Sequence, residues 1–176
     1  MSDEAAIDAE EARLVAASRA GDQDAFADLV HRHKARVFRL AGRFFLRRED
    51  VEDVAQDTFI TAWRRLSTYA AKAPFEHWIT RICLRLCYAR LSSERRREIA
   101  APAEPSHATP SPIAAIDLER LLAKLSPADR FVLLLLDGEG WSVQEIADRI
   151  GWTATNVKVR AFRSRRRLRK ILEERS

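Results

Sequence analysis

The stretch from Trp141 to Lys170 constrains this chain most, because it predicts a helix, a tight turn and a second, strongly basic helix. Ser142 and Glu145 have the spacing of a capping box at the start of the first helix. Gly151 suits the left-handed conformation that a sharp turn needs, and Thr153 is placed to cap the second helix. This order of signals predicts a helix-turn-helix.

The second of these helices has an apolar face and a basic face. Four apolar residues recur at helical spacing and are expected to pack inward: Val157, Ala161, Leu168 and Leu172. Another face, near the helix start where base edges are usually read, carries Lys158, Val159, Phe162 and Arg163. No acid occurs between Thr155 and Lys170. Such a density of cations favours phosphate neutralisation, so we expect DNA binding; a solvated basic helix in another helical protein is the alternative.

Composition supports an acidic partner. The chain has 176 residues, 47% hydrophobic and 32% charged, which is enough for one domain or two small ones. With only 5 glycines and few β-branched runs, we expect a nearly all-α protein. The net charge of +5 and pI near 9.7 favour nucleic acid first.

Other classes of protein are disfavoured by what the sequence contains. No stretch is apolar for long enough to span a membrane, and the acidic start differs from a signal peptide, so we expect a cytoplasmic chain without membrane insertion of its own. Cys83 and Cys87 are expected to be buried apolar residues rather than metal ligands. We find no Gly-rich phosphate loop, metal-ligand cluster or nucleophile with a nearby base, so we expect neither an enzyme nor a cofactor.

The segment 50–66 predicts a helix, capped by Asp50, with an acidic and polar patch. Acids at a helix start are favoured by the helix dipole, which accounts for Glu52 and Asp53. Gln56 and Asp57 lie a full turn further in. A surface for a partner is therefore the second interpretation of this patch.

The segment 67–74 predicts a loop with Tyr69 and Lys72 exposed on it, and Pro74 suits the start of the next helix. That helix interleaves aromatic and basic residues: Trp78, Arg81, Arg85 and Tyr88. Rings on which bases stack, mixed with cations that hold phosphates, suit single-stranded or unstacked nucleic acid. A core role for the two aromatic residues is the alternative.

The segment 99–113 is rich in Pro and Ala and has no periodicity, which predicts a flexible linker. A further helix is expected before Leu125, and Ser126 is expected to cap the next one with Pro127 at its first position. The sequence therefore predicts two small helical domains joined by this linker.

These features together resemble the bacterial RNA polymerase sigma factors of the extracytoplasmic-function (ECF) group, over nearly the whole chain. The polymerase-binding helix of that family is similar to residues 50–64, DVEDVAQDTFITAWR. The start of the family's fourth region is similar to LSPADR at 125–130 and GWSVQEIA at 140–147. Its recognition helix is similar to residues 156–168, NVKVRAFRSRRRL. A single helix-turn-helix is only moderately specific, but both sets of motifs in this order are strongly specific.

The resemblance implies an all-α fold with sigma region 2 at residues 1–97, a linker at 98–115 and sigma region 4 at 116–176. It implies a factor that binds core RNA polymerase, directs promoter-specific initiation in response to a stress or envelope signal, and is controlled by an anti-sigma factor. Polymerase would be bound by Asp53, Gln56 and Asp57. The minus-ten element would be opened and held by Tyr69, Lys72, Trp78, Arg81, Arg85 and Tyr88. The minus-thirty-five element would be bound by Thr155, Asn156, Lys158, Val159, Arg160, Phe162, Arg163, Arg165 and Arg166.

Within the last group, the base-edge readers are expected to be Lys158, Phe162 and Arg163, and Arg160, Arg165 and Arg166 are expected to contact phosphates. The sequence departs from the family pattern at Arg85 and Ala89, where Asn and then Asp are often found, and at Val159, where Ser is often found. These departures bear on the promoter sequence rather than on the fold.

Two other functions fit parts of the sequence. A DNA-binding regulator that does not engage polymerase would need only the helix-turn-helix. An adaptor or anti-sigma-like protein would keep the fold without promoter function, and the departures at Arg85 and Ala89 are the feature that would favour it. The patch of Asp53, Gln56 and Asp57, together with the helix of arginines and aromatic residues, favours the sigma factor over the plain regulator.

Overall fold

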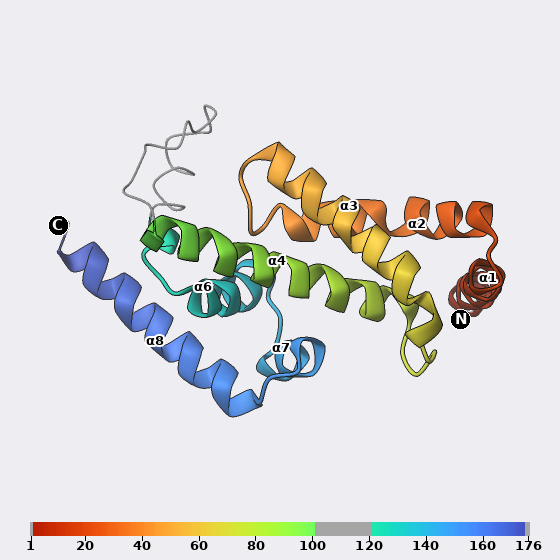
Figure 1. Ribbon diagram of the computed structural model, residues 1–176. Coiled ribbons are helices and arrows are strands. Elements are labelled where there is room, and N and C mark those ends of the chain that lie inside the picture. Colours follow the sequence, from red (N-terminus) through yellow and green to blue (C-terminus); the bar gives the residue numbers. More distant parts are fainter. Residues whose placement is uncertain (1, 101–120, 175–176) are drawn as a thin grey trace. The chain divides into compact units, whose positions relative to one another are not determined.

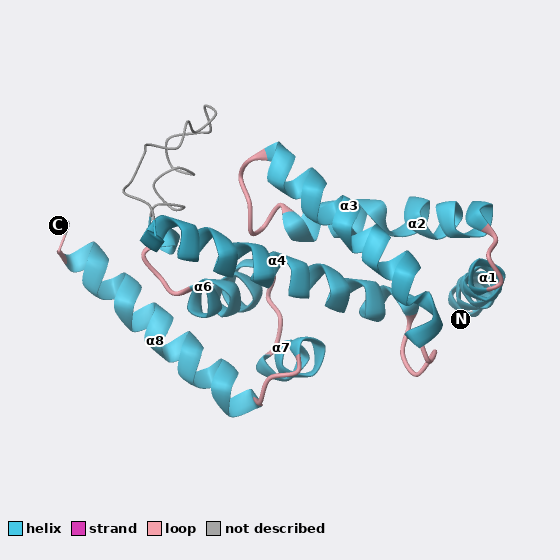
Figure 2. Cartoon of the chain, viewed as in Figure 1, coloured by secondary structure: helices cyan, strands magenta, loops and turns pink. Residues whose placement is uncertain are grey.

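The computed structural model describes residues 2–100 and 121–174, and these residues form helices, turns and loops with no strand among them (Figures 1 and 2). The all-α prediction is therefore confirmed for this part of the chain. Most of the predicted linker, and much of the helix expected before Leu125, lie outside the described residues. None of the described helices combines the length and the apolar character that crossing a bilayer demands.

The chain divides into two compact units, residues 1–42 with 48–86, and residues 43–47 with 87–176. The long helix α4 (Phe75–Ala100) contributes its first half to the first unit and its second half to the second. The domain limits inferred from the sequence, 1–97 and 116–176, stay a prediction.

The first unit is built from α1 (Ser2–Arg19), α2 (Gln23–Ala41), α3 (Arg48–Arg65), the short 3-10 turn η1 (Leu66–Thr68) and the start of α4. Helix α2 packs against both α1 and α3, and α1 crosses its end steeply (Figure 1). Large side chains from three of these helices are fully buried in this unit: Leu14, Leu29, Val37, Phe75 and Ile79. Arg36 of α2 reaches Glu76 of α4 at 3.1 Å, which ties the two helices at their polar edge.

Local capping signals decide where two of these helices begin. The Asp22 carboxylate accepts hydrogen bonds from the backbone N–H groups of Asp24 and Ala25, at 2.9 and 3.0 Å, so it caps α2. Helix α3, in contrast, begins at Arg48. The expectation that Asp50 caps it is wrong, because Asp50 lies within its first turn, where a carboxylate still favours the helix dipole.

The second unit contains α6 (Pro127–Leu133), a π-helical turn η2 (Leu134–Gly138), α7 (Val143–Ile150) and α8 (Ala154–Glu173). Ser126 caps α6 and Pro127 occupies the first turn, as predicted. Helix α8 packs against both α6 and α7, and α7 meets the start of α8 at a steep angle (Figure 1).

The helix-turn-helix signals are confirmed in detail. The hydroxyl of Ser142 accepts a hydrogen bond from the backbone N–H of Glu145 at 3.1 Å, and the Glu145 carboxylate accepts one from the N–H of Ser142 at 2.8 Å. Gly151 ends α7 in the left-handed conformation with φ of 75°. Thr153 caps α8 by accepting from the N–H of Asn156 at 3.2 Å. The turn and both helix starts therefore follow from local chemistry.

The inward face of α8 is largely the predicted one. Val157 and Ala161 are buried, and Leu168 packs against a cluster of Leu122, Leu125 and Leu133. Leu172 was expected to pack inward as well, but half of it is exposed, because it lies one turn beyond the end of this cluster. Ser164 is buried instead, and its hydroxyl donates to the carbonyl of Ala161 at 3.0 Å.

We expect Gly151→Ala to lower the free energy of unfolding by about 1–2 kcal/mol, because an alanine with φ of 75° is strained although open space surrounds its Cβ position. Gly138→Ala is the matched control, since that site is equally open and has no positive φ. Urea unfolding followed by circular dichroism measures the free energy of unfolding of both variants. Equal stability of the two would show that the turn carries no backbone strain.

Candidate nucleic-acid interface

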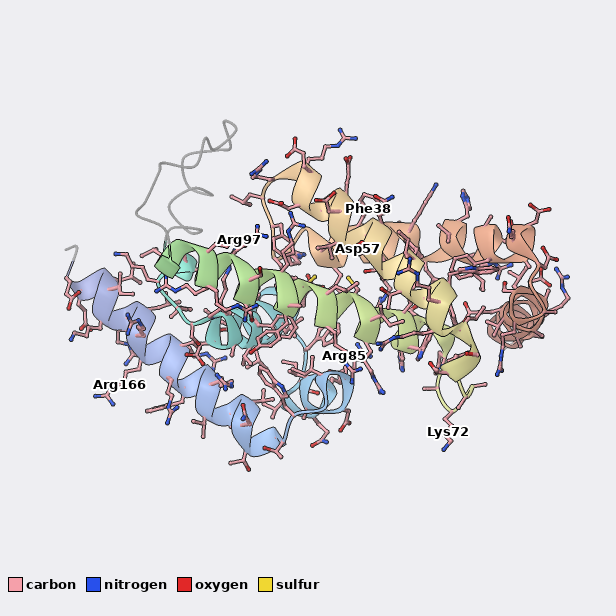
Figure 3. All side chains as sticks on the ribbon, in the orientation of Figure 1. Phe38, Asp57, Lys72, Arg85, Arg97 and Arg166 are labelled. Atoms are coloured by element: carbon pink, nitrogen blue, oxygen red, sulfur yellow. The ribbon has the colours of Figure 1, made fainter. Side chains whose placement is uncertain are left out.

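The outward face of α8 is a continuous exposed surface opposite its buried stripe. Because Val157, Ala161 and Ser164 face inward, most of the residues between them face solvent. The exposed residues of this face are Thr155, Asn156, Lys158, Val159, Phe162, Arg163 and Arg166. Figure 3 shows Arg166 pointing away from the body of the helix. All but two of the residues predicted to bind the minus-thirty-five element are therefore together on one surface.

An open groove of about 480 Å³ lies along this side of α8. It is lined by the apolar residues Leu136 and Val143 of the neighbouring segments and by four cations of α8: Lys158, Arg165, Arg166 and Arg169. Lys158, Arg166 and Arg169 make no ion pair with any described residue. Three of the four cations that line the groove are thus uncompensated, and the fourth, Arg165, is paired with Asp137.

Two arginines of α8 are engaged within the second unit. Arg160 is half-buried, where its guanidinium donates to Asn156 at 2.7 Å and to Asp129 at 3.3 Å and lies 5.0 Å over the ring of Trp152. These contacts brace the turn between α7 and α8 against α6. The contact with Asp129 could not be inferred from the sequence, because the two residues are 31 positions apart along the chain.

Arg165 is held in a similar way. Its guanidinium is bound by both carboxylate oxygens of Asp137, with Nε at 3.2 Å from one of them. This hydrogen bonding holds the pKa of Arg165 above its ordinary value. Arg165 remains exposed, so a phosphate would have to compete with Asp137 for it.

In the first unit, one exposed face of α3 carries the predicted polymerase-binding residues. Asp53, Gln56 and Asp57 are all exposed, and their spacing places them on the same side of the helix. Val54, Ala55 and Thr58 occupy the opposite, buried side. The predicted patch is therefore one contiguous surface, on which Asp57 is labelled in Figure 3.

Two large apolar residues that the sequence analysis did not assign to a surface extend this face. Ile60 is 39% exposed and Trp63 is 37% exposed. Ile60 lies three residues beyond Asp57, on the same side of α3, and Trp63 follows one turn later with its ring 4.9 Å from that of Phe26. The positions of Ile60 and Trp63, one and two turns after the acids, were the signal in the sequence that could have placed them on this face. The surface thus joins an acidic patch to an apolar one.

The loop between η1 and α4 differs from the prediction in one respect. Tyr69 was expected to be exposed, but it is buried. Its ring packs against Phe75 and Trp78, with centroids 5.4 Å apart in both pairs, and its hydroxyl donates to the carbonyl of Ala73 at 2.7 Å. The favourable free energy of burying the aromatic ring outweighs the general preference of loop residues for solvent. Tyr69 therefore shapes the loop rather than projecting from it.

Lys72 is exposed at the tip of this loop, as predicted, and Figure 3 shows it pointing outward. Ala71, beside it, has φ of 52°, in the left-handed region that residues with a side chain rarely adopt. Such strain costs about 1–2 kcal/mol, and it persists only where neighbouring contacts hold it. The hydroxyl of Tyr69 supplies one such contact, since its hydrogen bond to the carbonyl of Ala73 closes the loop across Ala71.

A cavity of about 490 Å³ opens between this loop and α1. Glu11 and Arg19 line it from α1, and Tyr69, Lys72 and Phe75 line it from the loop and α4. Glu11 is also bound to the ring nitrogen of His33 at 2.8 Å. Tyr69 and Phe75 are themselves almost fully buried, so their rings support the wall of the cavity and are barely exposed in it.

The remaining predicted minus-ten residues lie on α4. Arg81 and Arg85 are exposed one turn apart, on the same face of the helix, and Trp78 is half-buried a turn before them. Tyr88 is separate from this group. It belongs to the second unit, where its half-buried ring packs edge-on against Phe131 and Trp152. The first unit therefore groups five of the six residues, with Tyr88 outside the group.

The side chains of Cys83 and Cys87 are both fully buried, as the sequence analysis predicted.

Comparisons with known proteins place this architecture in a family. The model of sigma-70 region 2 matches residues 15–97, and the model of sigma-70 region 4 matches residues 115–168. The ECF RNA polymerase sigma factor SigM of Mycobacterium tuberculosis is 32% identical over 169 residues, which cover 92% of this chain and 84% of SigM. The chain belongs to the ECF sigma factor family. This sigma factor is a non-enzymatic transcription initiation factor.

The sigma factor CnrH of Cupriavidus metallidurans is similar both in sequence and in structure. It is 31% identical over 177 residues, which cover 91% of this chain and 93% of CnrH. The structure of CnrH in complex with the cytosolic domain of CnrY superposes with a TM-score of 0.62 at 30% identity, covering 95% of this chain and 99% of that one. The sigma factor RpoE of Bartonella quintana shares the fold, with a TM-score of 0.61 at 21% identity over 84% of this chain and 96% of that one.

We expect Arg160→Ala to lower the free energy of unfolding of this sigma factor by about 1–2 kcal/mol in the absence of DNA, since it removes an ion pair and a cation–π contact that are partly shielded from solvent. Arg166→Ala, an exposed arginine of the same helix, should change it by no more than about 0.5 kcal/mol. Urea unfolding of both variants tests this. A similar small change in both would mean that the Asp129 contact does not brace the turn.

Proposed function

We propose that this sigma factor uses three separate surfaces in initiation: the α3 face for core RNA polymerase, the loop of residues 67–75 with α4 for the minus-ten element, and the outward face of α8 for the minus-thirty-five element. The observation that carries the proposal is the exposed face of α8, where Lys158 and Arg163 lie in the first half of the helix and Arg166 follows, with no acidic residue among them. The first two surfaces lie within the first unit and the third within the second.

The polymerase contact is assigned to Asp53, Gln56 and Asp57. What supports this is that a polar, acidic patch continues into the exposed apolar residues Ile60 and Trp63 on the same helix. Interfaces commonly combine an apolar centre with a charged rim, and aromatic residues are enriched at their centre. The acids would select a basic surface on polymerase, and the apolar residues would add affinity.

For the minus-ten element, the cavity between α1 and the loop offers space for an extruded base. Extrusion costs a few kcal/mol, which contacts with the protein must offset. Lys72, Arg81 and Arg85 would hold the phosphates of the opened strand, and Trp78 would offer a ring for stacking. Tyr69 would act by fixing the loop, because its own ring and hydroxyl are already engaged. Tyr88 stays a predicted contributor, at a distance along the chain from this group.

For the minus-thirty-five element, the exposed residues Lys158, Phe162 and Arg163 are assigned to base edges, and Arg166 to a phosphate. Thr155 and Asn156, at the helix start, are assigned to contacts with the DNA backbone. Arg160 and Arg165 stay candidate phosphate contacts, and their bonds to Asp129 and Asp137 would then orient them.

We further propose that the factor works in the cytoplasm, where polymerase and promoter are found, and that an anti-sigma factor holds it inactive. The support for the latter comes from relatives. RpoE of Bartonella quintana was solved in complex with the anti-sigma factor NepR, and CnrH was solved with the cytosolic domain of CnrY.

Reconstitution with core RNA polymerase tests the proposal, with the promoter upstream of the chain's own gene as template. We expect a holoenzyme that produces a specific transcript, and we expect Asp57→Ala to weaken binding to core by about tenfold, the equivalent of ~1.4 kcal/mol at an interface hot spot. Asp28→Ala is the matched control, because Asp28 is an exposed acid on α2, away from this patch. Affinity for core is measured by fluorescence titration.

The possible outcomes separate the candidate functions. DNA binding without binding to core polymerase would favour a plain helix-turn-helix regulator. Binding to core without a transcript would favour an adaptor, or implicate the departures at Arg85 and Ala89. An Asp57→Ala variant that binds core as well as Asp28→Ala does would refute the assignment of the acidic patch.

Variants of α8 separate base readers from phosphate contacts. Lys158→Ala and Arg163→Ala are expected to cost about 1–3 kcal/mol each in specific promoter binding and to relax discrimination against random duplex. Arg166→Ala is expected to weaken binding to all sequences about equally and to reduce the slope of log affinity against log salt by about 1. Holoenzyme binding to promoter and random duplex over a range of salt measures both effects. Unchanged discrimination in the first two variants would remove their role as base readers.

A further inference from the structure

The recognition face of α8 exposes two large apolar side chains among its cations. Val159 is 40% exposed and Phe162 is 68% exposed. They are three residues apart, so they lie on the same side of the helix. Phe162 also lines the groove beside α8, together with Lys158 and Arg166. An apolar patch within such a basic surface is disfavoured in water unless a partner covers it.

The charge around this patch identifies the partner as nucleic acid. Lys158, Arg163 and Arg166 surround the two apolar residues and have no acidic partner among the described residues. Within the major groove of DNA, the base edges present hydrogen-bonding groups and one apolar group, the C5-methyl of thymine. Val159 and Phe162 carry no hydrogen-bonding group in their side chains. The thymine methyl is therefore the one feature of a base edge that they match.

We propose that Val159 and Phe162 contact the 5-methyl groups of thymines and so determine positions of A·T pairs in the upstream promoter element. The inference rests on the proposed reading of that element by α8 and deepens it. The side chain of Val159 neither donates nor accepts a hydrogen bond, whereas a hydroxyl at this position would do both. The neighbouring Lys158 and Arg163 supply the polar contacts.

Replacement of thymine by uracil tests the proposal, because it removes the methyl group and leaves every hydrogen-bonding group in place. The probe is duplex DNA of the promoter upstream of the chain's own gene, with each thymine of the upstream element replaced singly on either strand. We expect one or two replacements to weaken holoenzyme binding about fourfold each, the equivalent of ~0.8 kcal/mol per buried methyl, and the others to have no effect.

Protein variants assign the sensitive positions. Val159→Ser and Phe162→Ala are each expected to remove the sensitivity to uracil at one position and to keep the remaining discrimination of the promoter. Leu172→Ala is the matched control, because Leu172 is an equally exposed apolar residue of the same helix, 50% exposed and far from the helix start. It should keep the full pattern. Circular dichroism of each variant verifies that the helix content is unchanged.

Each outcome decides the matter. Loss of sensitivity in Val159→Ser or Phe162→Ala, with the pattern kept in Leu172→Ala, supports the proposal. A holoenzyme that binds the promoter specifically but tolerates uracil everywhere overturns it and leaves the proposed function intact. Sensitivity that persists in both variants assigns the methyl contacts to other residues and also overturns it. A chain that does not bind the unmodified promoter overturns the proposed function and this inference with it.

Discussion

The rotation of α8 about its own axis is the constraint on which the recognition surface depends. Val157, Ala161 and Ser164 are buried. Leu168 packs on a cluster of leucines from α6 and the segment just before it. A rotation by one residue would move about 100° of the helix surface, and would exchange buried and exposed side chains. Because the buried stripe is fixed by packing, the outward face is fixed as well. The proposed base contacts of Lys158 and Arg163 would therefore derive their geometry from the buried residues on the opposite side.

Acids within the second unit refine this surface by engaging particular arginines. Asp129 binds Arg160 and Asp137 binds Arg165, and both acids belong to the segment just before the helix-turn-helix. Either pair is partly exposed and contributes modestly to stability, but each fixes a long side chain that would otherwise be free. The remaining exposed cations of the face, Lys158, Arg163 and Arg166, are left available for the proposed contacts with DNA. The division between braced and free arginines is thus a property of the fold as much as of the helix.

The sequence predicted those features that depend on near neighbours. The caps at Asp22, Ser126, Ser142 and Thr153 and the left-handed turn at Gly151 each involve residues within a few positions, so spacing alone identifies them. The prediction that Tyr69 is exposed was wrong because its burial depends on contacts with Phe75 and Trp78, which form only in the folded chain. The contacts of Arg160 and Arg165 were missed for the same reason. Leu172 has the helical spacing of a buried residue, but it is half exposed because the apolar cluster on that side of the helix ends at Leu168.

The energetics of α8 explain why such a factor works through polymerase. A good bidentate base contact discriminates by about 1–3 kcal/mol, and a methyl contact adds about 0.8 kcal/mol. Two contacts of each kind do not reach the upper end of the 4–10 kcal/mol that separates specific from non-specific binding in dedicated DNA-binding proteins. The proposed minus-ten contacts of the first unit would add a second, independent element, and tethering both to one polymerase would make the second contact intramolecular. Specificity would then come from two moderately specific contacts with promoter DNA that are linked through the polymerase, so neither surface would need a high affinity for DNA by itself.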